Sequence, residues 1–377
     1  MTPAMIIVGT RPEAIKLAPV ILALRQKSSR LKPIVCLTGQ HPEIAQQAFD
    51  VFDIRAEINM NCVPPGGDLC KTAASVIEAT GHWIDKLGPA AVIVQGDTLS
   101  AFAGGFATVL RRIPMAHVEA GLRSGNLADP FPEELSRRQL TQIATWNFAP
   151  TVAAIDNLLR ENVAQATIHL VGNTVVDALR IARTRIAAPH DDTGRLVLVS
   201  AHRRENWGMP MASICTAVRT LASRHDDWRF VFGLHPNPQL QSVIRRALAD
   251  LPNVQLVSAP PYDEWLQYLF SSELIMTDSG GMQEEGCAIG RPVLVLRDTT
   301  ERPEAIDAGA ALLVGRSTDA IVRQAERVMG DPAIYAEMAR PRDVFGNGHA
   351  ADRISEILHG DLQLDAELNA TTTANVN

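Results

Sequence analysis

Several signatures that define particular classes of protein are missing from this chain of 377 residues. Its five cysteines are odd in number and widely spaced, and no C-x-x-C pair suggests zinc binding or redox chemistry. There is no G-x-G-x-x-G fingerprint of a dinucleotide site and no cluster of metal-ligating residues. The sequence therefore predicts no metal and no cofactor, and it predicts reduced, buried thiols at Cys36, Cys62, Cys70, Cys215 and Cys287.

Positive charge and long apolar runs are also scarce. The formal net charge is −7, so no global field favours binding to nucleic acid or to an anionic membrane. The first apolar run, from Ala4 to Val8, is too short for a membrane span or a signal peptide and follows no basic segment. We expect a cytoplasmic protein without nucleic-acid or membrane partners, in which local cations hold any anionic substrate.

The sequence does contain a regular alternation of short apolar runs and longer amphipathic stretches. With 46% hydrophobic and 20% charged residues the chain can form packed cores, and its length favours two domains. Such alternation predicts βαβ units, so we expect an α/β fold with a doubly wound parallel sheet in each half. The expected strands are Met5 to Val8, Ile34 to Leu37, Ala91 to Val94, Met115 to Val118, Leu196 to Ser200, Phe230 to Phe232, Leu274 to Met276 and Pro292 to Leu296.

Turn and linker residues indicate where the two domains meet. Val171 to Thr174 is typical of a turn that caps a helix, and Ala187 to Gly194 is a connection rich in Pro, Asp and Gly. We expect a first domain at residues 1–172 and a second at 173–361. The polar end of the chain, residues 362–377, has little to bury and is expected to be disordered.

Polar motifs follow the expected strands of the first half, where open α/β sheets bind their ligands. Gly9 to Lys16 combines a glycine, a helix-opening proline and two cations suited to an anion; the alternative is a plain turn with solvated cations. Carboxylates follow in Gln95 to Thr98, His117 to Arg123 and Phe131 to Glu134, although an acid at a helix start is often only a dipole partner. Several carboxylates around one pocket can supply both an acid and a base.

The second half repeats this arrangement with more positive charge. Ala201 to Asn206 brings an imidazole and two guanidiniums to a strand end, which suits a diphosphate unless it is a surface charge cluster. Thr277 to Glu285 places a glycine pair where a helix opens, and the free N–H groups there can cradle phosphates. Glu285, further into that helix, can accept the hydroxyls of a ribose or simply be solvated. Arg297 to Glu304 adds dense charge after the next strand.

In this order, from Val8 to Gly315, the motifs closely resemble those of the non-hydrolysing UDP-N-acetylglucosamine 2-epimerases. They are G-T-R-P-E-A-I-K, G-D-T, H-V-E-A-G-L-R, F-P-E-E, H-R-R-E-N, T-D-S-G-G-x-Q-E-E and R-D-T-T-E-R-P-E. The resemblance implies the glycosyltransferase B architecture, with two Rossmann-like domains facing across a cleft. It further implies a final helix, near Ala350 to Leu358, that crosses back onto the first domain, and assembly as a homodimer.

The resemblance also implies a reaction and a set of site residues. UDP-GlcNAc and UDP-ManNAc would interconvert by anti elimination of UDP to a 2-acetamidoglucal and readdition, without a cofactor. A positioned base must take the weakly acidic proton on carbon 2, and the base and acid are not apportioned among the carboxylates. The implied catalytic residues are Asp97, Glu119, Glu133 and His202, and the implied substrate-binding residues are Arg11, Lys16, Trp265, Ser279, Gly280, Gly281, Glu285 and Arg302.

Two departures from the family pattern qualify this expectation. Many bacterial members bind a second UDP-GlcNAc as an activator through Q-H-R-E and a nearby basic residue, whereas this chain has Gln40 to Glu43 as Q-H-P-E and an uncharged Cys62 to Gly67. We therefore expect weak or absent activation. Trp265 stands at the usual phenylalanine position beside the uracil, where its indole ring offers a larger stacking face.

The sequence leaves four alternative functions open. They are a hydrolysing 2-epimerase that releases ManNAc and UDP, an epimerase for a related UDP-amino sugar, a glycosyltransferase of the same architecture and a non-catalytic sensor.

Overall fold

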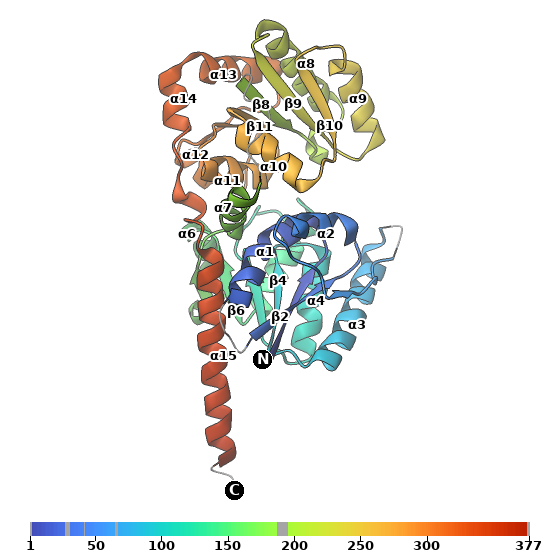
Figure 1. The fold of residues 1–377 in the computed structure, drawn as a ribbon, viewed down its shortest axis with the longest axis vertical. Coiled ribbons are helices and arrows are strands. Elements are labelled where there is room, and N and C mark those ends of the chain that lie inside the picture. The colour runs from blue at the N-terminus through green and yellow to red at the C-terminus, as the bar shows by residue number, and fades with distance from the viewer. Residues whose placement is uncertain (1, 27–30, 41, 65–66, 187–194, 375–377) are drawn as a thin grey trace. The chain divides into compact units, whose positions relative to one another are not determined.

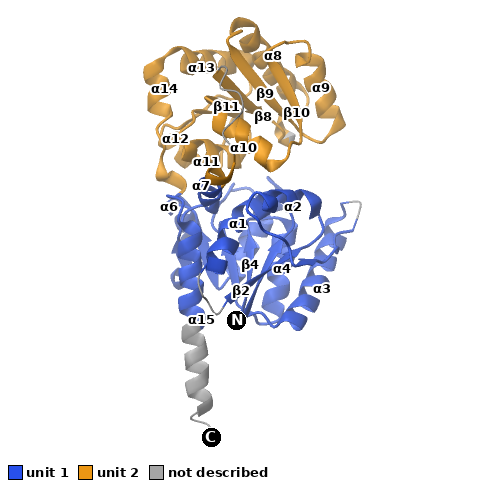
Figure 2. Ribbon diagram, viewed as in Figure 1, with its two compact units in different colours: residues 1–181, 346–377 blue, residues 182–345 orange. Residues whose placement is uncertain are grey.

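The computed structural model describes residues 2–26, 31–40, 42–64, 67–186 and 195–374, with the side chains of all but 204 and 363–374. The chain forms two compact units, one of residues 1–181 and 346–377 and one of residues 182–345 (Figure 2). Each unit contains a parallel sheet whose successive strands are joined through helices (Figure 1). The α/β class predicted from the alternation of runs is therefore confirmed.

The first unit is built on a seven-stranded parallel sheet with the order β3-β2-β1-β4-β5-β6-β7. The direction of winding reverses between β1 and β4, so the loops after these two strands diverge at the carboxyl edge. Parallel strands are covered on both faces, which is why Met5 to Val8 form an unbroken, fully buried run. The strands are β1 (Thr2–Val8), β2 (Leu31–Leu37), β3 (Ile58–Asn59), β4 (Ala91–Gln95), β5 (Met115–Val118), β6 (Trp146–Ala149) and β7 (Ile168–Leu170).

Helices cover both faces of this sheet. Met5 and Ile7 pack in one core cluster with Ile84, Ala101 and Leu140 of α3, α4 and α5. Because side chains alternate along a strand, Ile6 and Val8 face the other side. There α1 packs against α2 and α15. The helices are α1 (Arg11–Gln26), α2 (Pro42–Asp50), α3 (Leu69–Leu87), α4 (Leu99–Leu110), α5 (Glu133–Ile143), α6 (Val152–Arg160), α7 (Thr174–Arg185) and α15 (Ala350–Ala374).

The second unit repeats the pattern with a six-stranded parallel sheet in the order β10-β9-β8-β11-β12-β13, which reverses between β8 and β11. Its strands are β8 (Arg195–Ser200), β9 (Trp228–Leu234), β10 (Val254–Ser258), β11 (Leu274–Thr277), β12 (Val293–Val295) and β13 (Ala311–Leu313). Its helices are α8 (Met209–Arg224), α9 (Pro238–Leu248), α10 (Tyr262–Ser271), α11 (Gly280–Ile289), α12 (Pro303–Asp307), α13 (Thr318–Gly330) and α14 (Pro332–Met338).

The division between the units differs from the boundary expected at residues 172 and 173. It falls between residues 181 and 182, because the first turns of α7 are tied to the returning chain around α15. Asp177 Oδ1 accepts a hydrogen bond from Ala351 N at 2.9 Å, and Arg180 Nε donates to Gly348 O at 3.1 Å. At the end of the chain, α15 is assigned through Ala374 and residues 375–377 lie outside the described part, so the expected disorder of residues 362–377 stays a prediction.

Two expectations about composition can be compared with the described residues. No helix in this part of the chain is both long enough and apolar enough to cross a membrane. All five cysteines are unpaired thiols, and Cys36, Cys215 and Cys287 are buried as predicted. Cys62 is only partly buried, and the prediction of burial is wrong for Cys70, which is exposed in the first turn of α3. An amphipathic surface helix can carry a small residue such as cysteine on its solvent side without cost.

Replacing Gly286 by alanine tests how closely α11 packs on the second sheet. A Cβ atom at this position would lie 2.5 Å from Val293 Cγ2 and 3.0 Å from Ile275 Cδ1. We expect Gly286→Ala to lower the free energy of unfolding by about 1 to 3 kcal/mol through overpacking. Urea denaturation measures this loss. Gly281→Ala on the same helix is the control, because its Cβ would be 3.9 Å from the nearest atom, and an equal loss in both variants would contradict the close contact.

Candidate active site

A buried carboxylate, Glu13, organises the loop that follows β1. Glu13 is fully buried in the first turn of α1. Its Oε2 accepts hydrogen bonds from Gly9 N at 3.1 Å, Thr10 N at 2.6 Å and Thr10 Oγ1 at 2.7 Å. Its Oε1 accepts from Thr98 Oγ1 at 2.7 Å, so one side chain joins the loop after β1 to the loop after β4. Arg11 and Asp97, both predicted site residues, stand beside the bonded positions on these loops.

Burial has an electrostatic consequence for Glu13. Removal from water raises the pKa of Glu13 to about 7, although the hydrogen bonds from Thr10, Thr98 and Gly9 lower it. Thr98 is itself fixed, because its hydroxyl caps α4 by accepting from Ala101 N at 3.0 Å. The two loops are therefore held together by a group whose charge changes near neutral pH.

Lys16 and Glu119 form a buried ion pair on the same edge of the sheet. Lys16 Nζ donates to Glu119 Oε2, and the two side chains are 10% and 9% exposed. Asn173 Nδ2 donates to the same oxygen at 3.0 Å, while Asn173 Oδ1 accepts from Val175 N at 3.0 Å. Glu119 has a φ of 65°, a left-handed conformation that is unfavourable for residues other than glycine. The carboxylate is thus held from two sides on a strained backbone.

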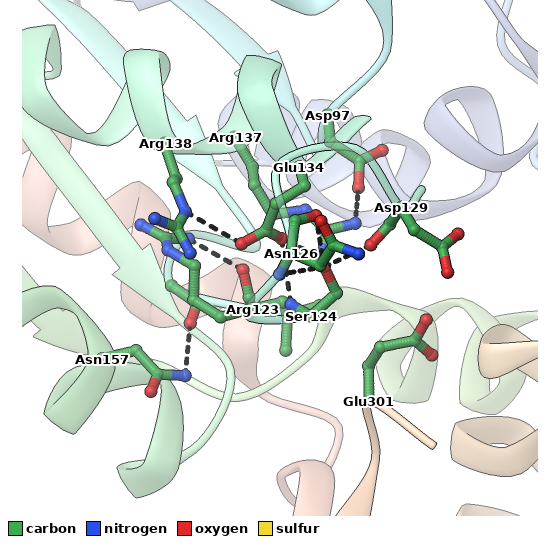
Figure 3. A network of polar contacts seen from close by, with 12 residues as sticks. Asp97, Arg123, Ser124, Asn126, Asp129, Glu134, Arg137, Arg138, Asn157 and Glu301 are labelled. Carbon is green, nitrogen blue, oxygen red and sulfur yellow. Dashed lines mark hydrogen bonds and ion pairs between the residues drawn. The ribbon is translucent and has the colours of Figure 1, made fainter. Parts of the chain in front are cut away.

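Asp97 is paired with an arginine from α5 rather than with a residue of its own loop (Figure 3). Arg137 Nη2 donates to Asp97 Oδ2, and the two side chains are 9% and 29% exposed. Of the two adjacent glutamates that open α5, Glu134 is fully buried, whereas Glu133 is only partly buried. Glu134 accepts from Ser124 N at 2.9 Å and from Arg138 Nε at 2.9 Å. Glu133 therefore remains the more accessible carboxylate of the pair.

His117 ties the ends of β4 and β5 together. Its ring is fully buried, and Nε2 lies 2.7 Å from Gly96 O, a contact in which the ring nitrogen donates. Burial lowers the pKa of His117 to about 4, so the ring is neutral at physiological pH. Gly96 N in turn donates to Val118 O at 2.9 Å. These bonds keep Asp97 and Glu119 at the ends of neighbouring strands.

In the second unit, the fully buried Asp278 plays a part similar to that of Glu13. Its Oδ2 accepts from His202 N at 2.8 Å, Arg203 N at 2.9 Å and Asn206 Nδ2 at 2.8 Å. This carboxylate follows β11 and holds the loop that follows β8, so it bridges the two strands at the winding reversal. The ring of His202 is 41% exposed and stacks on that of His235, with 6.0 Å between centroids.

The glycine pair for which the sequence predicts a phosphate cradle lies at the start of α11. Ser279 is the N-cap residue, with extended backbone, and its hydroxyl makes no capping hydrogen bond to the helix. Gly280 is the first helical residue, and a Cβ atom there would lie 3.2 Å from Arg302 Cζ. The Arg302 guanidinium thus packs against the helix start, where its Nε donates to buried Glu284 Oε1 at 2.6 Å. Glu285, one residue on, is partly buried.

Two further residues from the predicted site segments of this unit are Trp265 and Glu301. Trp265 of α10 lies over Gly233 of β9, where a Cβ atom would come within 2.9 Å of the indole ring. Glu301 accepts from Arg297 Nη1 at 2.7 Å. Burial alone would raise the pKa of Glu301, but the hydrogen bond from Arg297 and the charges of Arg203, Arg297 and Arg302 outweigh it and lower the pKa to about 2. The negative charge of Glu301 is therefore neutralised by neighbouring arginines.

The structure collects the predicted residues into two groups. In the first unit, residues after β1, β4 and β5 and at the start of α5 supply Arg11, Lys16, Asp97, Glu119 and Glu133. In the second unit, residues after β8 and β11, α10 and the loop before α12 supply His202, Trp265, Ser279, Gly280, Gly281, Glu285 and Arg302. Within the described residues, no group of three or more His, Cys, Asp or Glu side chains is placed to hold a metal ion.

Sequence reasoning missed the residues that hold these groups in place. They are Glu13, Glu134, Arg137, Asn173 and Asp278. Glu13, Glu134 and Asp278 lie inside motifs that were recognised, but nothing in a linear pattern shows that their carboxylates are buried. In the two segments expected to lack an activator site, His41 and residues 65–66 lie outside the described part of the chain.

Glu13→Gln should change how the stability of the protein depends on pH. The folded pKa near 7 exceeds the ordinary value of 4.5, so the folded state binds this proton more tightly than the unfolded state. The stabilising contribution is complete below the unfolded pKa and disappears as the pH rises through the folded pKa. The free energy of unfolding of the wild type relative to Glu13→Gln should fall by about 2 to 3 kcal/mol between about pH 5 and about pH 8.

Urea denaturation of both proteins across this pH range measures the effect. Glu43→Gln, which alters an exposed glutamate in the first turn of α2, is the control and should leave the pH dependence unchanged. A difference between wild type and Glu13→Gln that stays constant with pH would show that Glu13 does not titrate in this window.

Comparison of the chain with known proteins identifies its family. A family model described as UDP-N-acetylglucosamine 2-epimerase matches residues 23–359. The UDP-N-acetylglucosamine 2-epimerase of Escherichia coli (strain K12) is 39% identical over 363 residues, which cover 93% of this chain and 96% of that protein.

Solved structures agree with the sequence comparison. The crystal structure of UDP-GlcNAc 2-epimerase from Neisseria meningitidis bound to UDP-GlcNAc has a TM-score of 0.89 and 36% identity, and covers 95% of this chain and 99% of that one. A glycotransferase of kitacinnamycin, 14% identical with a TM-score of 0.66 over 96% of this chain and 99% of its own, shares the fold alone. From the matched length and identity, the chain belongs to the UDP-N-acetylglucosamine 2-epimerase family.

Proposed function

We propose that this protein is a non-hydrolysing epimerase that interconverts UDP-GlcNAc and UDP-ManNAc. The observation that carries the proposal is the presence of two ionisable carboxylates, Asp97 and Glu119, at the ends of the neighbouring strands β4 and β5, each bonded to a buried cation. Inversion at carbon 2 needs a base and an acid on opposite faces of the sugar. A pair of fixed carboxylates, with the accessible Glu133 nearby in sequence on α5, supplies groups of that kind.

The second unit supplies groups suited to the UDP part of the substrate. The N–H groups at the start of α11, with the Ser279 hydroxyl, favour phosphate oxygens, and the exposed His202 ring can donate to an oxygen of the diphosphate. Glu285 is available for the ribose hydroxyls and Trp265 for stacking on uracil. In the relative from Neisseria meningitidis the bound molecule is UDP-GlcNAc, which supports the same class of ligand here.

The proposed reaction is an elimination followed by a readdition. A carboxylate takes the proton from carbon 2 while the bond between carbon 1 and the UDP oxygen breaks, and the freed electron pair forms the double bond of 2-acetamidoglucal. UDP leaves as an anion that the cationic groups hold. A proton then returns to carbon 2 on the other face and UDP rebonds to carbon 1, so nothing is oxidised, reduced or hydrolysed. Lys16 and Arg11 would contact the sugar and the phosphates.

Three further features are part of this proposal. The two units would act as the domains of the glycosyltransferase B architecture, with the diphosphate group in the second and the carboxylates in the first. The protein would work in the cytoplasm as a homodimer. Activation by a second UDP-GlcNAc would be weak or absent, because Pro42 stands where many bacterial relatives have an arginine.

Proton NMR in deuterated water tests the reaction directly. The wild type incubated with UDP-GlcNAc should incorporate solvent deuterium at carbon 2 and form UDP-ManNAc. Free N-acetylmannosamine with stoichiometric UDP would instead identify a hydrolysing epimerase. Absence of exchange at carbon 2 would contradict every epimerase mechanism and leave a glycosyltransferase or a sensor.

Asp97→Asn and Glu119→Gln should each lower the rate of carbon 2 exchange by about 10² to 10⁴, because each removes a proton-transferring group. Asp85→Asn is the matched control, since Asp85 also pairs with an arginine, Arg111, at 2.9 Å, but on the exposed surface of α3. Initial rates of exchange and UDP-ManNAc formation give the comparison. A loss in Asp85→Asn equal to that in Asp97→Asn would remove the special role of Asp97.

A further inference from the structure

Arg137 is a buried cation that the proposed chemistry leaves without a role. It lies in α5 and is 8% exposed. Its Nη2 donates a hydrogen bond to Oδ2 of Asp97, which lies in the loop after β4 (Figure 3). Its Nε and Nη1 are buried and make no hydrogen bond within the described residues. An arginine removed from water with only part of its hydrogen-bonding capacity used is costly to retain. Such a residue calls for an explanation beyond packing.

Glu134 fixes the orientation of this arginine. Glu134 Oε2 lies 3.4 Å from Arg137 Nη1, and the same carboxylate is held by Ser124 N and by Arg138 Nε. It is fully buried and bonded from several directions, so it has little freedom to move. The guanidinium of Arg137 is therefore held between two carboxylates, Glu134 inside the unit and Asp97 at its edge.

The ion pair with Arg137 gives the two carboxylate oxygens of Asp97 different surroundings. Oδ2 receives the hydrogen bond from Arg137, while Oδ1 makes no hydrogen bond to any other described residue. The Asp97 side chain is 29% exposed, so its second oxygen can be reached from outside. Rotation about the bond to the carboxyl group would exchange the two oxygens, but it would break the ion pair. Asp97 thus offers one defined oxygen in one orientation.

We propose that Arg137 is the positioning residue of Asp97, holding Oδ2 from the buried side so that Oδ1 is directed at the proton that Asp97 transfers. This inference rests on the proposed function, because it assumes that Asp97 exchanges a proton with the substrate. A shift of about 1 Å in a reacting group can cost about a hundredfold in rate, so a fixed partner matters even without touching the substrate.

An arginine suits this position better than a lysine. Its planar group presents several donors in fixed directions, and here it spans Asp97 and Glu134 at once. A lysine at the same position carries a single charged nitrogen, which can reach one carboxylate but not both. The neighbouring Arg138 provides a natural comparison, because it lies on the same helix and also pairs with Glu134, but its second ion pair is with Glu161 rather than with Asp97.

Variants of these two arginines test the assignment through carbon 2 exchange from UDP-GlcNAc. Arg137→Met should lower kcat about a hundredfold while KM changes less than about threefold, because the UDP-binding groups belong to the second unit. Arg137→Lys should recover at least about tenfold of this loss through the remaining charge. Arg138→Met should stay within about threefold of the wild type, because the Glu134 oxygen that faces Arg137 keeps its hydrogen bond from Ser124 N. Should Arg137→Met fail to fold, Arg137→Lys compared with Arg138→Lys gives the same contrast.

A double-mutant cycle separates positioning from a general structural effect. If Arg137 acts through Asp97, adding Arg137→Met to Asp97→Asn should cause no more than about a twofold further loss of kcat. Losses that multiply, or an Arg138→Met loss equal to that of Arg137→Met, would overturn the inference while leaving epimerisation intact. A wild type that exchanges no carbon 2 proton would instead refute the proposed function on which the inference rests.

Discussion

Each unit depends on one buried carboxylate at the point where its sheet reverses direction. A carboxylate without water is stable only if hydrogen-bond donors surround it, and the strand-end loops provide those donors through their backbone N–H groups. Glu13 binds the loop after β1 and reaches Thr98 after β4, and Asp278 after β11 binds the loop after β8. The need to satisfy these two buried carboxyl groups fixes the loops that contain the candidate site residues.

Ion pairs elsewhere in the two units also place buried charges next to opposite charges. Lys16 and Glu119, Arg137 and Asp97, and Arg302 and Glu284 are ion pairs in which at least one partner is nearly buried. Breaking one side of such a pair leaves an uncompensated charge in a poorly solvated place, which is strongly unfavourable. Side chains that we propose to move protons or hold anions are therefore given defined positions by ion-pair partners. The ionised groups are arranged in nearly neutral sets, as the three arginines and three carboxylates around α5 illustrate.

The sequence was informative wherever a strand is a continuous apolar run. All eight expected runs are strands, because parallel strands buried on both faces contain little else. It failed for β6, where buried Asn147 interrupts the run, for the two-residue β3, and for β7, β10 and β13 at the sheet margins, where partial exposure weakens the pattern. Strand-end motifs identified candidate residues such as Asp97 and Ser279, and the family resemblance supplied their roles. The partners Arg137 and Asn173 could not be found in this way, since a pairing between distant segments exists only in the folded chain.

The left-handed backbone of Glu119 carries an implication for evolution in the laboratory. A glutamate at a φ of 65° is less favourable there than glycine or asparagine by an amount on the order of 1 kcal/mol or more. Exchange of Glu119 for one of those residues would relieve this strain, but it would also remove the carboxylate that neutralises the charge of Lys16, which costs more. Libraries screened for robustness should therefore vary codons 16 and 119 together, because the backbone strain at one position is tied to a buried charge at the other.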